Sequence, residues 1–304
     1  MSDPAPKSGI YGPFEPRLVR QRKRRARASL REAAFLHERV AADLADRLEE
    51  IPRPFPNVLV LGAYEAFDLE MRMRDDLPRR VGRSSVIRAD FSNGDVTIDP
   101  EHFPFAPGSF DLIVSPLALH WINDLPGALI QLRLALKPDG LLLASLFGGE
   151  TLHELRLSLI EAESELTGGA GPRVSPFADL QDIAGLLQRA GFALPAADRD
   201  VVTVRYGEPM RLLADLRAMG ETSALRERSS RGLSRRILAR AFEIYRERYS
   251  DDDNRVRATF EILTATGWSP HESQQKPLKP GSAKMRLSDA LNTEEKSACE
   301  KPGD

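Results

Sequence analysis

The chain has 304 residues, 41% of them hydrophobic, and its 43 basic and 45 acidic residues give a formal net charge of -2. This length allows two domains or one large α/β domain with additions, and the near-neutral charge gives no reason to expect nucleic acid as a partner. The single cysteine, Cys299, excludes an intramolecular disulfide and a cysteine-based metal cluster.

No stretch approaches the roughly 20 apolar residues that cross a bilayer, and the N-terminus lacks the apolar core of a secretory signal. We therefore expect no membrane span. The expected location is the cytoplasm for a bacterial source and the mitochondrial matrix for a eukaryotic one.

The N-terminal part divides into two segments. Residues 1–14 are rich in proline, serine and glycine, which predicts a flexible tail. Residues 15–50 predict a basic helical extension, with eight Lys and Arg and no acid from Arg17 to Arg31. This basic run is either a solvated helical face or a face that binds RNA or an acidic partner surface.

Residues 51–270 predict one α/β domain. After the proline-rich connector at 51–56, short apolar runs predict strands at 57–62, 84–90, 95–99, 112–114 and 141–147, and Ser115 and Pro116 end the fourth of these. Leu129, Leu132 and Leu136 recur at helical spacing between the last two strands, and Lys137-Pro-Asp-Gly140 ends that helix. A strand, a helix and a strand in this order predict a parallel sheet.

The loop from Ser115 to Trp121 follows the carboxyl end of a buried strand, where ligands of open α/β sheets bind. We expect it to line a pocket, with His120 as a base or hydrogen-bond partner. Trp121 either stacks on a ligand or plugs the helix against the sheet. Asp111 lies at the opposite end of the same strand, so its expected role is structural.

The remaining chain alternates helices and strands. Helices are predicted at 151–166, 175–191, 209–219 and 233–249, and strands at 201–204 and 256–262. Residues 271–304 predict an extended, partly disordered tail, with an edge contact at 281–287. No spacing of His, Cys and Asp suits zinc, so no metal site is expected.

Two stretches carry a family resemblance, namely FDLIVSPLALHWINDLPGALIQLRLALKPDGLLLASLFGGETLHELR and, further on, GWSPHESQQKPLKPGSA. The first resembles class I S-adenosylmethionine-dependent methyltransferases. Together with MRLLADLRAMGE, the two resemble the complex I assembly factor 5 family and its bacterial relatives. The resemblance implies a Rossmann-like fold with a seven-stranded, mostly parallel sheet, helices on both faces and a helical insertion at 207–250.

The resemblance also implies a cofactor and its contacts. S-adenosylmethionine would lie near Gly62, Asp90, Asp99, Ser115 and Trp121. In this family's pattern, an acid like Asp90 accepts hydrogen bonds from the ribose hydroxyls, and one like Asp99 lies near the adenine. Each of these acids has an alternative, a turn or cap aspartate, because aspartate favours such positions anyway.

The glycine-rich turn departs from the family pattern L-D-L-G-x-G-x-G. Only Gly62 is retained, while Val60 replaces the acid and Tyr64 and Ala66 replace the later glycines. A β-carbon at these positions enters space that the cofactor needs and disfavours a positive φ. Two hypotheses follow: a methyltransferase-like protein that acts on a protein substrate, with a complex I subunit as a candidate, or a non-catalytic assembly module that no longer binds the cofactor.

Overall fold

The computed structural model describes residues 12–62, 64–92, 94–99, 101–228 and 232–275, together with 288, 289 and 293. Contacts divide the chain into two units, Met1–Pro270 and His271–Asp304, and the fold below belongs to the first. Most of the N-terminal tail (1–11), the predicted edge contact at 281–287 and Cys299 lie outside the described residues.

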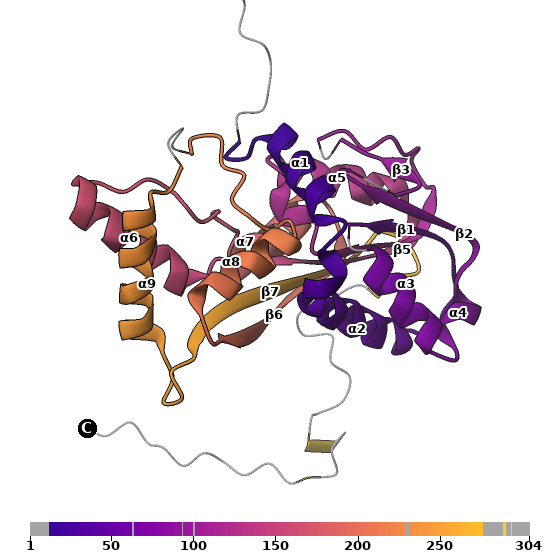
Figure 1. Ribbon diagram of the computed structural model, residues 1–304. Helices are drawn as coiled ribbons and strands as arrows, with labels where there is room; N and C mark the ends of the chain where they lie inside the picture. Colours follow the sequence, from indigo (N-terminus) through magenta and orange to yellow (C-terminus); the bar gives the residue numbers. More distant parts are fainter. Residues whose placement is uncertain are drawn as a thin grey trace, which may run out of the picture. The chain divides into compact units, whose positions relative to one another are not determined.

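A seven-stranded sheet forms the centre of this unit (Figure 1). Its order is β3-β2-β1-β4-β5-β7-β6; the pairs among β3, β2, β1, β4 and β5 are parallel, and β7 is antiparallel to β5 and β6. The predicted fold class is therefore confirmed. The strands are β1 Phe55–Leu61, β2 Val81–Asp90, β3 Val96–Thr97, β4 Phe110–Pro116, β5 Leu136–Phe147, β6 Ala193–Tyr206 and β7 Val256–Trp268.

Helices cover both faces of the sheet. They are α1 Pro16–Ala26, η1 Leu30–Ala33, α2 Phe35–Glu49, α3 Tyr64–Met73, α4 Leu77–Arg80, η2 Leu119–Trp121, α5 Leu125–Ala135, α6 His153–Thr167, α7 Leu180–Arg189, α8 Pro209–Ala218 and α9 Arg235–Tyr249. The insertion predicted between the last two strands consists of α8 and α9, and α9 packs against α6 (Figure 1).

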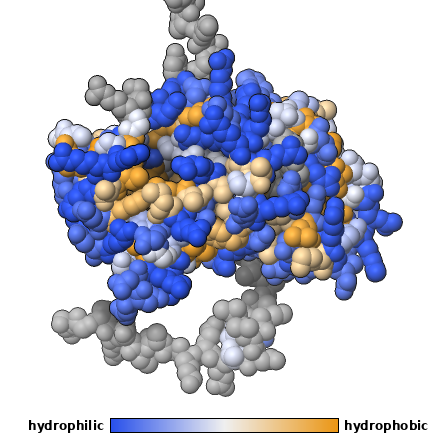
Figure 2. Space-filling view, in the orientation of Figure 1, coloured by the Kyte–Doolittle hydropathy of each residue, from blue (hydrophilic) through white to orange (hydrophobic). Residues whose placement is uncertain are grey.

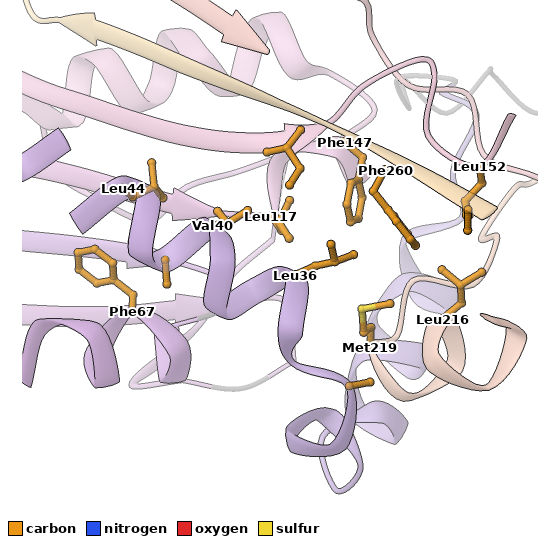
Figure 3. Close-up of a cluster of buried hydrophobic side chains, with 14 of the residues drawn as sticks. Leu36, Val40, Leu44, Phe67, Leu117, Phe147, Leu152, Leu216, Met219 and Phe260 are labelled. Carbon is orange, nitrogen blue, oxygen red and sulfur yellow. The ribbon is translucent and has the colours of Figure 1, made fainter. Parts of the chain in front are cut away.

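The alternation of side chains along each strand explains the two layers of core. In β1, Val58 and Val60 join the cluster under α2, whereas Leu59 and Leu61 join the cluster under α5 and α7. Figure 3 shows the first cluster, where Leu36 and Val40 of α2 lie on the same side as Leu117. Both faces of the central strands are therefore buried, as their nearly continuous apolar sequence predicts.

The helices differ from the sequence predictions in three respects. The helix predicted from Ser175 begins at Leu180, because Asp179 and Asp182 form a capping box there. Helices α3 and α4 were not predicted, and the basic helix breaks after Ala26 into α1, η1 and α2. In the part of the chain that the structure describes, no helix is both long and apolar enough to cross a membrane.

Candidate functional site

A cavity of about 610 Å³ lies beyond the carboxyl ends of β1, β2 and β4. The loops that follow these strands contribute Gly62, Asp90, Leu117 and Ala118, and the N-terminal helices and α3 close the other sides. The residues that line it are Lys23, Ala26, Arg27, Leu30, Arg31, Ala34, His37, Glu38, Gly62, Glu65, Ala66, Asp68, Leu69, Arg72, Asp90, Phe91, Ser92, Leu117, Ala118 and Met219. Its volume is in the range of small-molecule sites.

Gly62 forms the turn at the end of β1. Its φ of +92° lies in the region that favours glycine, and a β-carbon there would come within 2.6 Å of the β-carbon of Ala118. The Gly62 N–H donates to the carbonyl of Ala89 at 3.0 Å. The backbone at this point is therefore bare because no side chain fits, and it faces the cavity.

Asp90 ends β2 and lines the same cavity. Its Oδ2 accepts hydrogen bonds from the N–H and hydroxyl of Ser92, at 3.3 and 3.1 Å. No donor among the described residues reaches its other oxygen. Asp90 thus makes the local turn of the alternative prediction, and it also lines the cavity; its contact with a ligand stays a prediction.

The loop after β4 meets the cavity only in part. Leu117, at a strained φ of +51°, and Ala118 line it, whereas Ser115 is fully buried in β4 and its hydroxyl has no partner among the described residues. The prediction that Ser115 itself lines the cavity was therefore wrong. The physical reason is that β4 extends to Pro116, which keeps Ser115 inside the sheet, paired with Ala144 of β5.

His120 and Trp121 point to a buried carboxylate, that of Glu221. The Nε2 of His120 lies 3.0 Å from the Oε2 of Glu221, and the indole N–H of Trp121 donates to the same oxygen at 3.0 Å. Trp121 is 3% exposed and packs edge-on against Phe14, with ring centroids 5.2 Å apart. Neither residue lines the large cavity, so Trp121 takes the plug role; His120 lines a separate cavity of about 280 Å³.

Lys23 completes this cluster, because its ammonium bonds the second oxygen of Glu221. Burial alone would raise the pKa of Glu221, but Lys23 and His120 hold it far below the usual range. Burial lowers the pKa of His120 and outweighs the attraction of Glu221. The cluster is therefore an ionised carboxylate that accepts from an ammonium, a neutral imidazole and an indole.

His37 lies in α2, lines the large cavity and is 3% exposed. Burial and then the charge of Lys23 lower its pKa to about 4, so its ring is neutral near pH 7. Its Nδ1 has no hydrogen-bond partner among the described residues. A buried polar nitrogen without a partner is unusual, which distinguishes His37 from the other buried residues of α2.

Asp99 lies away from the large cavity. Its carboxylate pairs at 3.7 Å with Arg20 of α1, with 47% of the side chain exposed, and accepts from the N–H of Glu101 at 3.1 Å. It does not line that cavity, so the structure brings together Gly62 and Asp90 but not Asp99, Ser115 or Trp121.

The three positions at which the glycine-rich turn departs from the family pattern differ in their surroundings. Val60 is fully buried in the sheet, and Ala66 lines the large cavity from α3. The backbone of Tyr64 begins α3, but its side chain lies outside the described residues. In this turn the chain therefore reaches helix α3 one residue after Ala63, where the family pattern continues with glycine.

The amino end of the sheet contrasts with this cavity. Asp111 accepts from the backbone and side-chain nitrogens of Asn57, at 2.9 and 2.8 Å, and from Lys137 at 2.9 Å. Burial raises the pKa of Asp111, but the hydrogen bonds of Lys137 and Asn57 outweigh it and lower the pKa overall. This supports the structural role expected for Asp111.

Among the described residues, no group of three or more His, Cys, Asp and Glu is placed to hold a metal ion.

The order of the sheet and the cavity beyond β1, β2 and β4 define a class I methyltransferase fold. Residues 57–144 match the family model described as "Methyltransferase domain". This stretch contains Gly62, Asp90 and the loop after β4.

Several relatives align along most of the chain. Arginine-hydroxylase NDUFAF5, mitochondrial, of Danio rerio is 40% identical over 262 residues, which cover 84% of this chain and 81% of the relative. The Homo sapiens protein of the same name is 39% identical and covers 82% and 74%, respectively. A malonyl-[acyl-carrier protein] O-methyltransferase of Halorhodospira halophila is 32% identical and covers 84% and 88%. The chain therefore belongs to the NDUFAF5 family within the class I methyltransferase superfamily.

Proposed function

We propose that this chain binds S-adenosylmethionine and acts on a protein substrate, with complex I assembly as the setting. The observation that carries the proposal is that the bare Gly62 turn and the Asp90 carboxylate, one oxygen of which accepts no hydrogen bond from the described residues, line one cavity. The names of the relatives support the substrate class, since one specifies arginine and another an acyl-carrier protein. The expected compartment is the cytoplasm in bacteria and, as for the relatives named mitochondrial, the matrix in eukaryotes.

The residues present fit the cofactor in three respects. Gly62 places bare backbone in the cavity wall, where an added β-carbon would collide with Ala118. Asp90 offers a carboxylate oxygen for ribose hydroxyls. Glu38 and Glu65 also line the cavity and form no ion pair among the described residues, which suits a ligand with an ammonium and a sulfonium. When bound, the cofactor supplies an electrophilic methyl group.

The chain's own contribution is binding, alignment and proton handling. Asp90 would orient the ribose, and the apolar side chains of Leu117, Ala118 and Met219 would exclude water from that side of the cavity. His37 takes the role that the sequence suggested for His120, because it lines the cavity and a neutral imidazole is the form that accepts a proton. His120 acts instead as a support for Glu221.

A titration calorimetry experiment with S-adenosylmethionine tests cofactor binding. We expect saturable binding, weakened about 10- to 100-fold in Asp90→Ala, since a hydrogen bond to a charged acceptor contributes about 1.5–3 kcal/mol. Asp99→Ala is the matched control, because Asp99 lies outside the cavity lining, and should bind as the wild type does. Equal losses in both variants, or silence of the wild type at millimolar ligand, would overturn the proposal.

Arginine hydroxylation and methyl transfer are different reactions, and the two groups of relatives divide between them. Mass spectrometry of the protein substrate after incubation separates the reactions, because a methyl group and an oxygen atom add different masses.

The second candidate function, a non-catalytic assembly module, is motivated by Val60, Tyr64 and Ala66 in the turn. It predicts neither modification nor cofactor binding.

A further inference from the structure

A second, more open cavity lies beside the first. Five of the residues that line it are arginines, namely Arg17, Arg20, Arg24 and Arg25 of α1 and Arg228. Glu15 is the one acid among its described lining residues. We call this cavity the arginine groove. Figure 2 shows a hydrophilic surface over the part of this face where Figure 1 places α1.

The charge of the arginine groove is not neutralised from within. Arg17, Arg24 and Arg25 form no ion pair among the described residues, and Arg20 reaches Asp99 only at 3.7 Å. Neighbouring Arg22 has a buried Nη1 without a partner in that part of the chain, and its pKa is lowered by burial and by the charges of Arg228 and Arg25. Several positive charges close together repel one another, and a bound anion would reduce that repulsion.

The groove is held in place from below. Val19 and Ala26 of α1 are buried, and Lys23 of the same helix is tied to Glu221. The N–H of Phe14, just before α1, donates to Asn123 at 2.9 Å, and that of Glu15 donates to Ala224 at 2.9 Å. The arginines therefore project from a fixed helix, so a ligand that binds them does not have to order the helix first.

The groove leads into the candidate cofactor cavity. Phe91 and Ser92, which follow Asp90, line both. Arg17, Arg20 and Arg24 lie at spacings of three and four residues on one side of α1, and Arg27 and Arg31 continue the spacing into the lining of the cofactor cavity. From Arg17 to Arg27 the helix rises about 15 Å, the length of about five residues of an extended chain.

We propose that the arginine groove binds an acidic segment of the protein substrate and so places the neighbouring target side chain in the cofactor cavity. This rests on the proposed function, because the occupant is the substrate of that same cavity. One feature favours a short acidic peptide over nucleic acid: the one aromatic residue of the described lining, Phe91, is buried and offers no ring for base stacking.

Fluorescence anisotropy with a labelled deca-glutamate peptide tests the groove. The test variant is Arg17→Gln/Arg24→Gln/Arg25→Gln, which leaves the residues of the cofactor cavity untouched. The control is Arg79→Gln/Arg83→Gln/Arg211→Gln, three exposed arginines without ion pairs among the described residues, outside the lining of both cavities. We expect peptide affinity to fall at least 10-fold in the test variant and by less than 2-fold in the control, with a salt dependence that flattens only in the test variant.

Two further probes decide the kind of anion. A ten-nucleotide RNA or inorganic tripolyphosphate that binds more tightly than the peptide, and loses that affinity in the test variant, overturns the proposal in favour of a nucleic-acid or phosphate site. Absence of peptide binding at low salt, or equal losses in both variants, also overturns it. Titration of the same variants with S-adenosylmethionine keeps the two proposals apart: peptide binding without cofactor binding refutes the proposed function alone, and the reverse refutes the groove alone.

Discussion

Two carboxylates differ in their surroundings, namely Asp90, which lines the candidate cofactor cavity, and Glu221, which bonds Lys23 of the same lining. Glu221 is buried, and both of its carboxylate oxygens accept hydrogen bonds, one from Lys23 and the other from His120 and Trp121. Asp90 lies at the cavity wall, and among the described residues its side chain accepts only from Ser92, two residues away. Glu221 therefore links three distant parts of the chain, around residues 23, 120 and 221. The Oδ1 of Asp90 accepts no hydrogen bond from the described residues, so it can accept one from a ligand.

The difference separates stability from function at this site. Removal of a carboxylate that holds a buried ammonium leaves that charge unpaired and costs stability. Removal of one that makes only a local turn costs little stability and removes a ligand contact. The predictions below test this separation from the largest expected effect to the smallest.

Glu221→Gln should lower the free energy of unfolding by about 3 kcal/mol, because the amide keeps the shape but leaves the Lys23 ammonium, whose side chain is only 15% exposed, without a counter-charge. Urea unfolding followed by circular dichroism measures it. The double variant Lys23→Met/Glu221→Gln is the control and should recover part of the loss, since the unpaired ammonium is gone. A loss below about 1 kcal/mol in the single variant would show that water reaches the pair.

Gly62→Ala should lower the unfolding free energy by about 3 kcal/mol, through a φ of +92° that alanine resists and a contact of 2.6 Å with Ala118. Gly108→Ala isolates the first cause, because Gly108 also has a positive φ, +66°, and nothing within 4 Å of the added β-carbon. It should cost about 1 kcal/mol. If both variants lose the same amount, the close approach to Ala118 contributes nothing.

His37 should make stability depend on pH. Its pKa is about 4 in the folded protein against 6.5 in the unfolded chain, so the unfolded chain binds the proton first as the pH falls. The contribution is fully present above pH 6.5 and is lost as the pH falls towards 4, and the loss amounts to about 2 kcal/mol by about pH 5. Urea unfolding at several pH values measures it against His37→Gln, whose stability should fall less over the same interval.

Local sequence signals predicted the sheet well. Apolar runs such as Leu112–Val114, and the strand, helix and strand around Lys137-Pro-Asp-Gly140, led to the right parallel pairing, because strands buried on both faces leave a continuous apolar record. Helix α3 was not predicted, because it begins at Tyr64, inside the turn where the family pattern L-D-L-G-x-G-x-G has glycines. The cap at Asp179 escaped because Ser175-Pro176 offered a competing start.

The candidate site was predictable only where it is local. Gly62 and Asp90 end strands, so their place in the cavity followed from the parallel sheet. Glu221 lies 198 residues from Lys23, and no periodicity joins the two. The same holds for His37, which the sequence analysis did not single out and which only the fold places at the cavity. Lys23 belongs to the basic run, for which the sequence predicted a solvated or partner-binding face and not a buried ion pair.

Asp90→Asn should change the unfolding free energy least, by no more than about 0.5 kcal/mol, because the amide oxygen can still accept from Ser92 and no buried cation loses a partner. The ligand readout should respond in the opposite order. Saturating S-adenosylmethionine should raise the melting temperature of the wild-type protein but raise that of Asp90→Asn much less. If Asp90→Asn instead loses as much stability as Glu221→Gln and keeps the full shift with ligand, Asp90 belongs among the structural carboxylates and the contrast between the two disappears.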